Sequence, residues 1–159
     1  MGALTQPWFL RNSINKNVKG SASIIDNNLI AVLISWTASL SGYPYTQDLP
    51  LLEFKPHDFF VEHACFGNTK CRVAAWYDDH GIIYIDENLR NNDDAITDSL
   101  IVHELVHYLQ DLSNKFDNAN CQDYLVRERE AYGVQRQYLN RIAGQFVAIY
   151  MNFPPCPEN

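Results

Sequence analysis

The chain carries few basic residues. Lys and Arg number 12 against 19 Asp and Glu, which gives a formal net charge of −7. Nucleic acids and anionic membrane surfaces are bound through basic faces, so this composition argues against both kinds of partner. Internal repeats and low-complexity tracts are also missing. With 159 residues, 47% of them hydrophobic, the chain is expected to form one globular domain around a single core.

Long hydrophobic runs are missing as well. The longest apolar stretch, residues 24–40, is interrupted by Asp26, Asn27, Asn28, Ser35 and Thr37. A bilayer span needs about 20 predominantly apolar residues, so this stretch predicts a core helix and no membrane span. The first residues also lack a basic segment followed by an apolar one, so no signal peptide is visible.

The segment Ile101-Val-His-Glu-Leu-Val-His-Tyr-Leu109 is the most informative part of the sequence. On an α-helix, His103 and His107 project from one face and can reach the same ion. Glu104, beside them, is placed to hold and deprotonate a water activated by that ion. This is the HExxH pattern of zinc metallopeptidases. The flanking residues are apolar, and burying two histidines and a carboxylate among them is costly unless a metal pairs with them.

A catalytic zinc ion takes three protein ligands, so the pattern requires a third. Helical periodicity places Glu128 on an apolar stripe and Glu130 on a side rich in arginine. The stripe with Glu128 also holds Leu125, Ala131, Tyr132, Gln135, Leu139, Ile142 and Phe146. A carboxylate in an apolar stripe needs a partner, so Glu128 is the predicted third ligand of Zn²⁺ and Glu130 is the alternative. A further alternative makes both of them surface ion-pair partners of nearby arginines.

These residues resemble the gluzincins, in which HExxH on one helix is completed by Glu on a following helix. A closer similarity is to small bacterial zincin-like domains and covers about residues 60–145. It rests on Cys65…Cys71-Arg-Val-Ala-Ala-Trp-Tyr77, Ile82-Ile-Tyr-Ile-Asp86, His103-Glu-Leu-Val-His-Tyr-Leu-Gln110, Cys121 and Glu128-Arg-Glu-Ala-Tyr132…Gln135. One position departs from the pattern: Tyr132 stands where an acid often braces a zinc-bound histidine.

The resemblance implies an α+β, minimal zincin-like fold and hydrolysis of a peptide or protein substrate. Glu104 would be the general base, and a strand upstream of the metal helix would pair with the extended substrate. A hydrogen-bond donor for the reaction intermediate is expected from Tyr132 or Tyr138, chosen from a set that also contains His80, Tyr84 and Tyr108. The alternative function is a non-catalytic zinc-binding or interaction domain on the same scaffold.

Four cysteines favour an oxidising compartment, and hence a periplasmic or secreted protein. Cys65 and Cys71 bracket a turn-rich loop that a small disulfide would close. Cys121 begins the glutamate helix and Cys156 lies in a proline-rich tail, so a second disulfide would pin that tail. The alternatives are four reduced, buried cysteines, or a Cys156 thiolate that reaches the zinc and keeps the enzyme latent.

The expected architecture is read from caps and turn residues. Residues 1–20 are expected to be loose, residues 21–150 to form the domain, and residues 151–159 to form the tail. A helix capped by Ser21 or Ser23 should run to about residue 39, and 43–55 should be connecting chain. A short helix (56–64) and a hairpin (72–77 and 82–85) should follow. The metal helix should span about 95–113, capped by Asp93 or Asp94, and the glutamate helix about 122–148.

Overall fold

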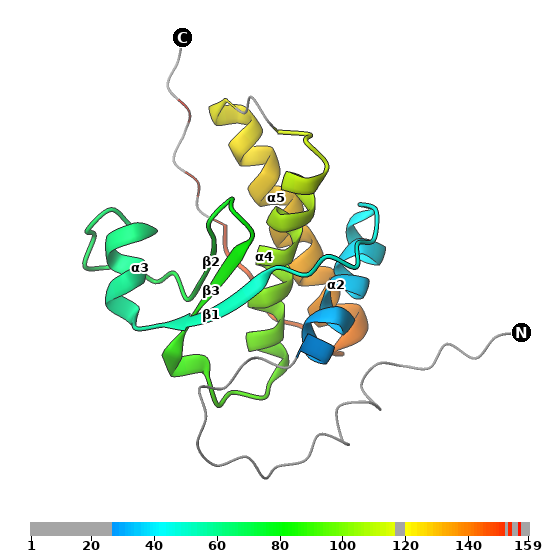
Figure 1. Ribbon diagram of the computed structural model, residues 1–159, viewed down its shortest axis with the longest axis horizontal. Coiled ribbons are helices and arrows are strands. Elements are labelled where there is room, and N and C mark those ends of the chain that lie inside the picture. Colours follow the sequence, from blue (N-terminus) through cyan, green and yellow to red (C-terminus); the bar gives the residue numbers. More distant parts are fainter. Residues whose placement is uncertain (1–26, 117–119, 152, 154–155, 157–159) are drawn as a thin grey trace, which may run out of the picture.

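Helices and a small mixed sheet form the part of the chain that the computed structural model describes, which is residues 27–116, 120–151, 153 and 156 (Figure 1). In chain order the elements are α2 (Asn27–Ser41), β1 (Leu51–Lys55), α3 (His57–His63), β2 (Ala75–Tyr77), β3 (Ile82–Asp86), the 3₁₀ turn η1 (Glu87–Leu89), α4 (Ala95–Leu112), α5 (Cys121–Gln137) and the π-helical turn η2 (Tyr138–Ile142). This is an α+β arrangement, as predicted. The predicted loose segment 1–20 and the caps at Ser21 and Ser23 lie outside the described residues.

The sheet has the strand order β1-β3-β2, with β1 parallel and β2 antiparallel to β3. The predicted hairpin is present. Its turn is closed by the Asp78 side chain, which accepts hydrogen bonds from the backbone N–H groups of His80 and Ile82. Strand β1 corrects the prediction of connecting chain over 43–55, because its partner is β3, about thirty residues further along. Local composition does not reveal a strand whose hydrogen bonds are all non-local.

Helix α4 runs through the middle of the molecule, between the sheet and helices α2 and α5 (Figure 1). Every residue from Ile101 to Gln110 is buried. On the sheet side, Ile83 and Ile85 of β3 join the same hydrophobic cluster, and on the other side α2 contributes apolar residues to it. A helix covered on all sides can carry polar side chains only where they have partners, so the motif of α4 lies in the core.

The helix boundaries follow local capping. Asp94 caps α4, as predicted, by accepting a hydrogen bond from the Thr97 N–H. Asn120 and Asp123 form a reciprocal capping box at the start of α5. The prediction that this helix continues to about residue 148 is wrong. It ends in η2, and Gly144 adopts a positive φ of 67°, which turns the chain. Phe146, predicted on the core-facing stripe, is therefore 89% exposed.

Both predicted disulfides are present, Cys65–Cys71 and Cys121–Cys156. Each has a Cα–Cα separation of 5.8 Å, which lies in the usual range for a disulfide. Disulfides persist in oxidising compartments, so the pairing fits a location outside the cytosol. Within the described ranges, no helix combines the length and the apolar character that crossing a bilayer requires.

The disulfide pairing is directly testable. Peptide mapping of the protein under non-reducing conditions should return fragments joined through Cys65 and Cys71 and through Cys121 and Cys156. Thiol titration in denaturant, without reductant, should find no free thiol. Four reactive thiols in that titration would contradict the pairing and the assignment to an oxidising compartment together.

Candidate metal centre

Three side chains from two helices converge in the core. His103 Nε2 and His107 Nε2, both on α4, lie 3.3 Å apart. Glu128, on α5, places Oε2 at 3.4 Å from the His103 nitrogen and Oε1 at 3.2 Å from the His107 nitrogen. The three residues can hold a metal ion, and they are the set predicted from the sequence. The one-turn spacing on α4 supplies two donors, and the packing of α5 against α4 supplies the third.

The protonation of His107 follows from its neighbour Gln110. The Gln110 Nε2 donates to the Arg127 carbonyl oxygen (3.1 Å) and to a Glu130 carboxylate oxygen (2.9 Å), both of which can only accept. The Gln110 Oε1 must therefore face His107 Nδ1, 2.9 Å away. An amide oxygen accepts, so Nδ1 carries the proton and Nε2 presents a lone pair to Glu128.

His103 is oriented in the same way by Gln135. The Ser99 hydroxyl donates to the Ile96 carbonyl, so its lone pair accepts from Gln135 Nε2 at 3.1 Å. This leaves Gln135 Oε1 facing His103 Nδ1, at 3.2 Å. Nδ1 of His103 is then the donor, and its Nε2 lone pair also points into the cluster. Two neutral glutamine amides thus fix both histidine tautomers, an outer-shell role that favours metal binding.

The consequence is a cluster of acceptors without a donor. Two imidazole lone pairs and a carboxylate converge in a site where all three side chains are largely buried. Burial raises the pKa of the Glu128 carboxyl, but where protons instead of a cation lie on the two Nε2 atoms, the hydrogen bonds from both histidines outweigh burial and hold that pKa well below its usual range. Burial lowers the pKa of His107, but Glu128 and then Glu104 outweigh it and raise that pKa. Both shifts indicate a place built for positive charge.

The spacing fits a tetrahedral ion of the size of Zn²⁺. Ligand bonds of about 2.0–2.1 Å at tetrahedral angles put donor atoms about 3.3–3.4 Å apart. The two histidine nitrogens are 3.3 Å apart, which fits this spacing, and each has one Glu128 oxygen at 3.2–3.4 Å. Two imidazoles and one carboxylate also form a ligand set typical of catalytic zinc, with one position left for water or substrate. The identity of the metal stays a prediction that this donor chemistry supports.

Glu130, the alternative ligand, lies in a different set of contacts. Its carboxylate accepts hydrogen bonds from Tyr43, Gln110 and Lys115. Glu130 is therefore paired with the Lys115 ammonium and the Tyr43 hydroxyl, away from the two histidines. Its link to the site is the hydrogen bond that it accepts from the Gln110 amide. The structure thus separates the two glutamates as helical periodicity predicted.

Glu104 lies beside the three converging atoms without joining them. Its side chain is 7% exposed, and the charges of Glu104 and Glu128 both act on His107. One carboxylate oxygen accepts a hydrogen bond from the Tyr77 backbone N–H of β2, at 2.9 Å. Within the described part of the chain, no Lys, Arg or His forms an ion pair with this carboxylate. Its second oxygen is therefore available to a bound water.

The tyrosine predictions have different outcomes. The Tyr132 ring packs edge-on against His103, with ring centroids 4.4 Å apart. Burial, and then the charges of Glu128 and Glu104, raise the Tyr132 pKa, so its hydroxyl stays protonated. The Tyr138 hydroxyl instead bonds to Asp98 in the buried part of α4. Tyr124 was not predicted as a site residue. It lies one turn before Glu128 on α5, whereas Tyr132 lies one turn after it. Burial is the largest cause that raises the pKa of Tyr124, and the charges of Glu128 and Glu104 raise it further.

The remaining sequence candidates lie elsewhere. Tyr108 donates to the Asp48 carbonyl, and Tyr84 stacks on Trp76 at the face of the sheet. The three other histidines are each at least partly exposed: His57, His63 and His80. Cys156 is disulfide-bonded, so the structure excludes the alternative in which its thiolate reaches the metal.

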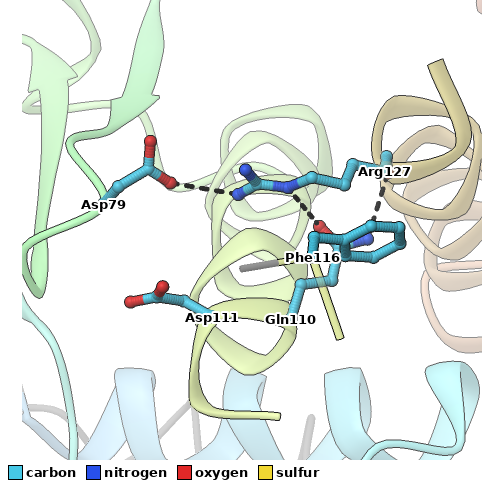
Figure 2. Close-up of a pocket in the computed structure, with 5 residues that line it drawn as sticks. All are labelled: Asp79, Gln110, Asp111, Phe116 and Arg127. Atoms are coloured by element: carbon cyan, nitrogen blue, oxygen red, sulfur yellow. Dashed lines mark hydrogen bonds and ion pairs between the residues drawn. The ribbon is translucent and has the colours of Figure 1, made fainter. Parts of the chain in front are cut away.

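A cavity of about 200 Å³ lies next to the centre, on the far side of Gln110. Figure 2 shows Arg127 reaching across it from α5, with one end bonded to Asp79 of the hairpin turn and the Nε group bonded to the Gln110 amide. Phe116 and Asp111 complete its lining. The hairpin, α5 and the residue that orients His107 are therefore linked through a single guanidinium.

Neutralising each glutamate distinguishes the two ligand assignments. Glu128→Gln removes a carboxylate oxygen from the cluster and is expected to weaken zinc binding roughly tenfold or more. Glu130→Gln is the matched control, because it makes the same chemical change outside the cluster and its amide oxygen can still accept the Gln110 hydrogen bond. Its zinc affinity should stay within about twofold of wild type. Competition titration with a chromophoric chelator measures both. Equal losses in the two variants, or a larger loss in Glu130→Gln, would reject the assignment of Glu128.

The glutamines should matter for metal affinity although neither touches the metal. Gln110→Ala and Gln135→Ala each free one imidazole to rotate or to change tautomer, which is expected to weaken zinc binding by roughly 10–100-fold. Gln122→Ala, an exposed change on the first turn of α5, is the control. The affinities are measured on samples whose circular dichroism matches wild type. Wild-type affinity in both variants would show that the amides do not orient the ligands.

No family model matches the chain, and the same holds for curated proteins and for solved structures. Three geometric features characterise the centre: the donor spacing, the two fixed histidine tautomers and the buried carboxylate of Glu104.

Proposed function

We propose that the protein is a zinc-dependent peptidase, with His103, His107 and Glu128 as metal ligands and Glu104 as the general base. The observation that carries this proposal is the setting of Glu104. It is a buried carboxylate next to the ligand cluster, held by a backbone N–H and without a cationic partner among the described residues. A site that only bound metal would have no need of this carboxylate, and burying it costs free energy.

The chemistry divides between the metal and the protein. Bound zinc supplies Lewis acidity, which activates a water and polarises a carbonyl group. The free oxygen of Glu104 accepts the proton of that water and passes it to the leaving amine. The Tyr77 N–H keeps the carboxylate in one orientation during both transfers. Tyr132, beside His103 and protonated, is the residue we assign to donate a hydrogen bond to the developing oxyanion.

The edge of the sheet supports an extended peptide as the substrate. Strand β2 is an edge strand. Just before it, Ala74 is hydrogen-bonded to Asp86, and just after it, Asp78 is hydrogen-bonded to Ile82. In an antiparallel ladder such pairs alternate, so the backbone groups of Ala75 and Tyr77 point away from β3. Tyr77 uses its N–H to hold Glu104. A peptide that pairs with the free edge at Ala75 would lie next to the general base.

Location and partners follow from the same features. Two disulfides favour a secreted or periplasmic protein, and a net charge of −7 argues against a nucleic-acid partner. A zinc-binding domain without catalysis is the remaining alternative. It predicts metal binding with no turnover in the wild-type protein.

Neutralising the general base separates these functions. Glu104→Gln should keep zinc stoichiometry and melting temperature close to wild type, because the residue does not ligate the metal. Turnover of a peptide found in a library screen should fall by about a hundredfold or more, since general-base catalysis contributes ~10²–10⁴. His103→Ala should lose metal, activity and several degrees of melting temperature together, because metal binding is coupled to folding.

Two results would contradict the proposal. A Glu104→Gln variant with full turnover would remove the residue from the mechanism. A wild-type protein that binds zinc but cleaves no peptide of a diverse library would leave the non-catalytic alternative.

A further inference from the structure

The chain turns back after η2 and returns along α5. Gly144 adopts a positive φ, and the Gln145 N–H bonds to the Leu139 carbonyl at 2.8 Å, which reverses the chain direction. Cys156 is then joined to Cys121, the first residue of α5. The described residues of this segment, which are 144–151, 153 and 156, are called the C-terminal strap below. Figure 1 shows the segment up to residue 151, in orange to red, leaving the end of η2.

The strap is held to the face of α5 that carries the metal ligand. Positions Cys121, Tyr124, Glu128 and Tyr132 recur every three or four residues, so they share one face of the helix. Phe153 contacts the ring of Tyr132, with centroids 6.1 Å apart, and that ring contacts His103. The two points of attachment therefore lie on either side of Glu128 along the helix.

Both anchors therefore attach to the α5 face that carries Glu128, at Cys121 and at Tyr132. The rise of α5 between these two positions is about 16 Å, at 1.5 Å per residue.

Burial contributes little to holding the strap in this position. Phe146 and Tyr150 are 89% and 92% exposed, and Met151 is also exposed. Phe153 and Cys156 are the partly buried exceptions near its end. Because these aromatic residues are exposed, the strap has no core of its own. Its two anchors, the Phe153 contact and the disulfide, hold it in place.

We propose that the C-terminal strap is a tethered competitor of the substrate, with Phe153 filling a subsite beside Tyr132 that takes a large apolar side chain of a bound peptide. The Cys121–Cys156 disulfide holds Phe153 there. This proposal rests on the proposed peptidase function, because it names the substrate class and the regulation of that same site. Tyr132 contacts the Phe153 ring and supplies one wall of this subsite, and Tyr124, one turn before Glu128, lies on the same face of the helix.

Tethering makes a weak contact effective. A short linker gives a bound group an effective concentration in the millimolar range, so one aromatic side chain competes although it would not bind as a free ligand. Removing the contact should therefore act mainly on substrate affinity. We expect Phe153→Ala to lower KM by about 3- to 30-fold with little change in kcat, and most for peptides with a large apolar residue next to the cleaved bond.

The experiment uses the full chain with a matched control in the same segment. Phe153→Ala is compared with Phe146→Ala, which removes the same side chain from an exposed position of the strap. A Cys121→Ser/Cys156→Ser double variant releases the other anchor and should resemble Phe153→Ala. If the double variant does not fold, the two phenylalanine variants still decide the proposal.

A second readout does not need peptide cleavage or bound metal. Diethyl pyrocarbonate labels accessible imidazoles, and mass spectrometry reports the labelling rate of His103 and His107 in the metal-free protein. Phe153→Ala should raise this rate at least threefold over wild type, and Phe146→Ala should not. If Phe153→Ala raises the labelling rate but no variant cleaves any peptide, the peptidase function is rejected, and the position of the strap over the site is retained. Identical labelling rates and KM values in Phe153→Ala and Phe146→Ala would overturn the proposal.

Discussion

The convergence of His103 Nε2, His107 Nε2 and the Glu128 carboxylate is the constraint on which the rest of the structure depends. Two imidazole nitrogens 3.3 Å apart, each with a carboxylate oxygen at 3.2–3.4 Å, repel one another in a buried site unless a cation lies between them. Their placement requires α4 to be fully covered, which the sheet achieves on one side and α2 and α5 on the other. It also requires α5 to pack closely enough for a glutamate to reach two histidines of its neighbour.

The glutamines around the centre have an electrostatic consequence. A carboxylate behind each histidine would orient it equally well but would add negative charge to a buried site. Gln110 and Gln135 orient both rings without adding any. A divalent cation held there would face the carboxylate of its ligand Glu128, with the carboxylate of Glu104 beside the cluster.

Sequence reasoning succeeded where the signal was local and failed where it was not. The histidine spacing, the caps at Asp94 and the hairpin turn are local patterns, and the structure bears them out. Glu128 was found because a carboxylate in an apolar stripe demands a partner. Gln135 lies on that same stripe and was missed, because a neutral amide there demands less. Strand β1 and the path of the chain after Gly144 depend on distant segments, so no window of local sequence revealed them.

The hairpin and the metal ligands are not independent parts of this fold. Arg127 bonds to Asp79 at the hairpin turn, and its Nε bonds to the Gln110 oxygen that orients His107. The same hairpin supplies the Tyr77 N–H that holds Glu104. A shift of β2 would therefore act on the base directly, through a backbone hydrogen bond, and on a ligand indirectly, through the guanidinium. The edge that we propose as the substrate platform is thus coupled twice to the centre that would carry out the hydrolysis.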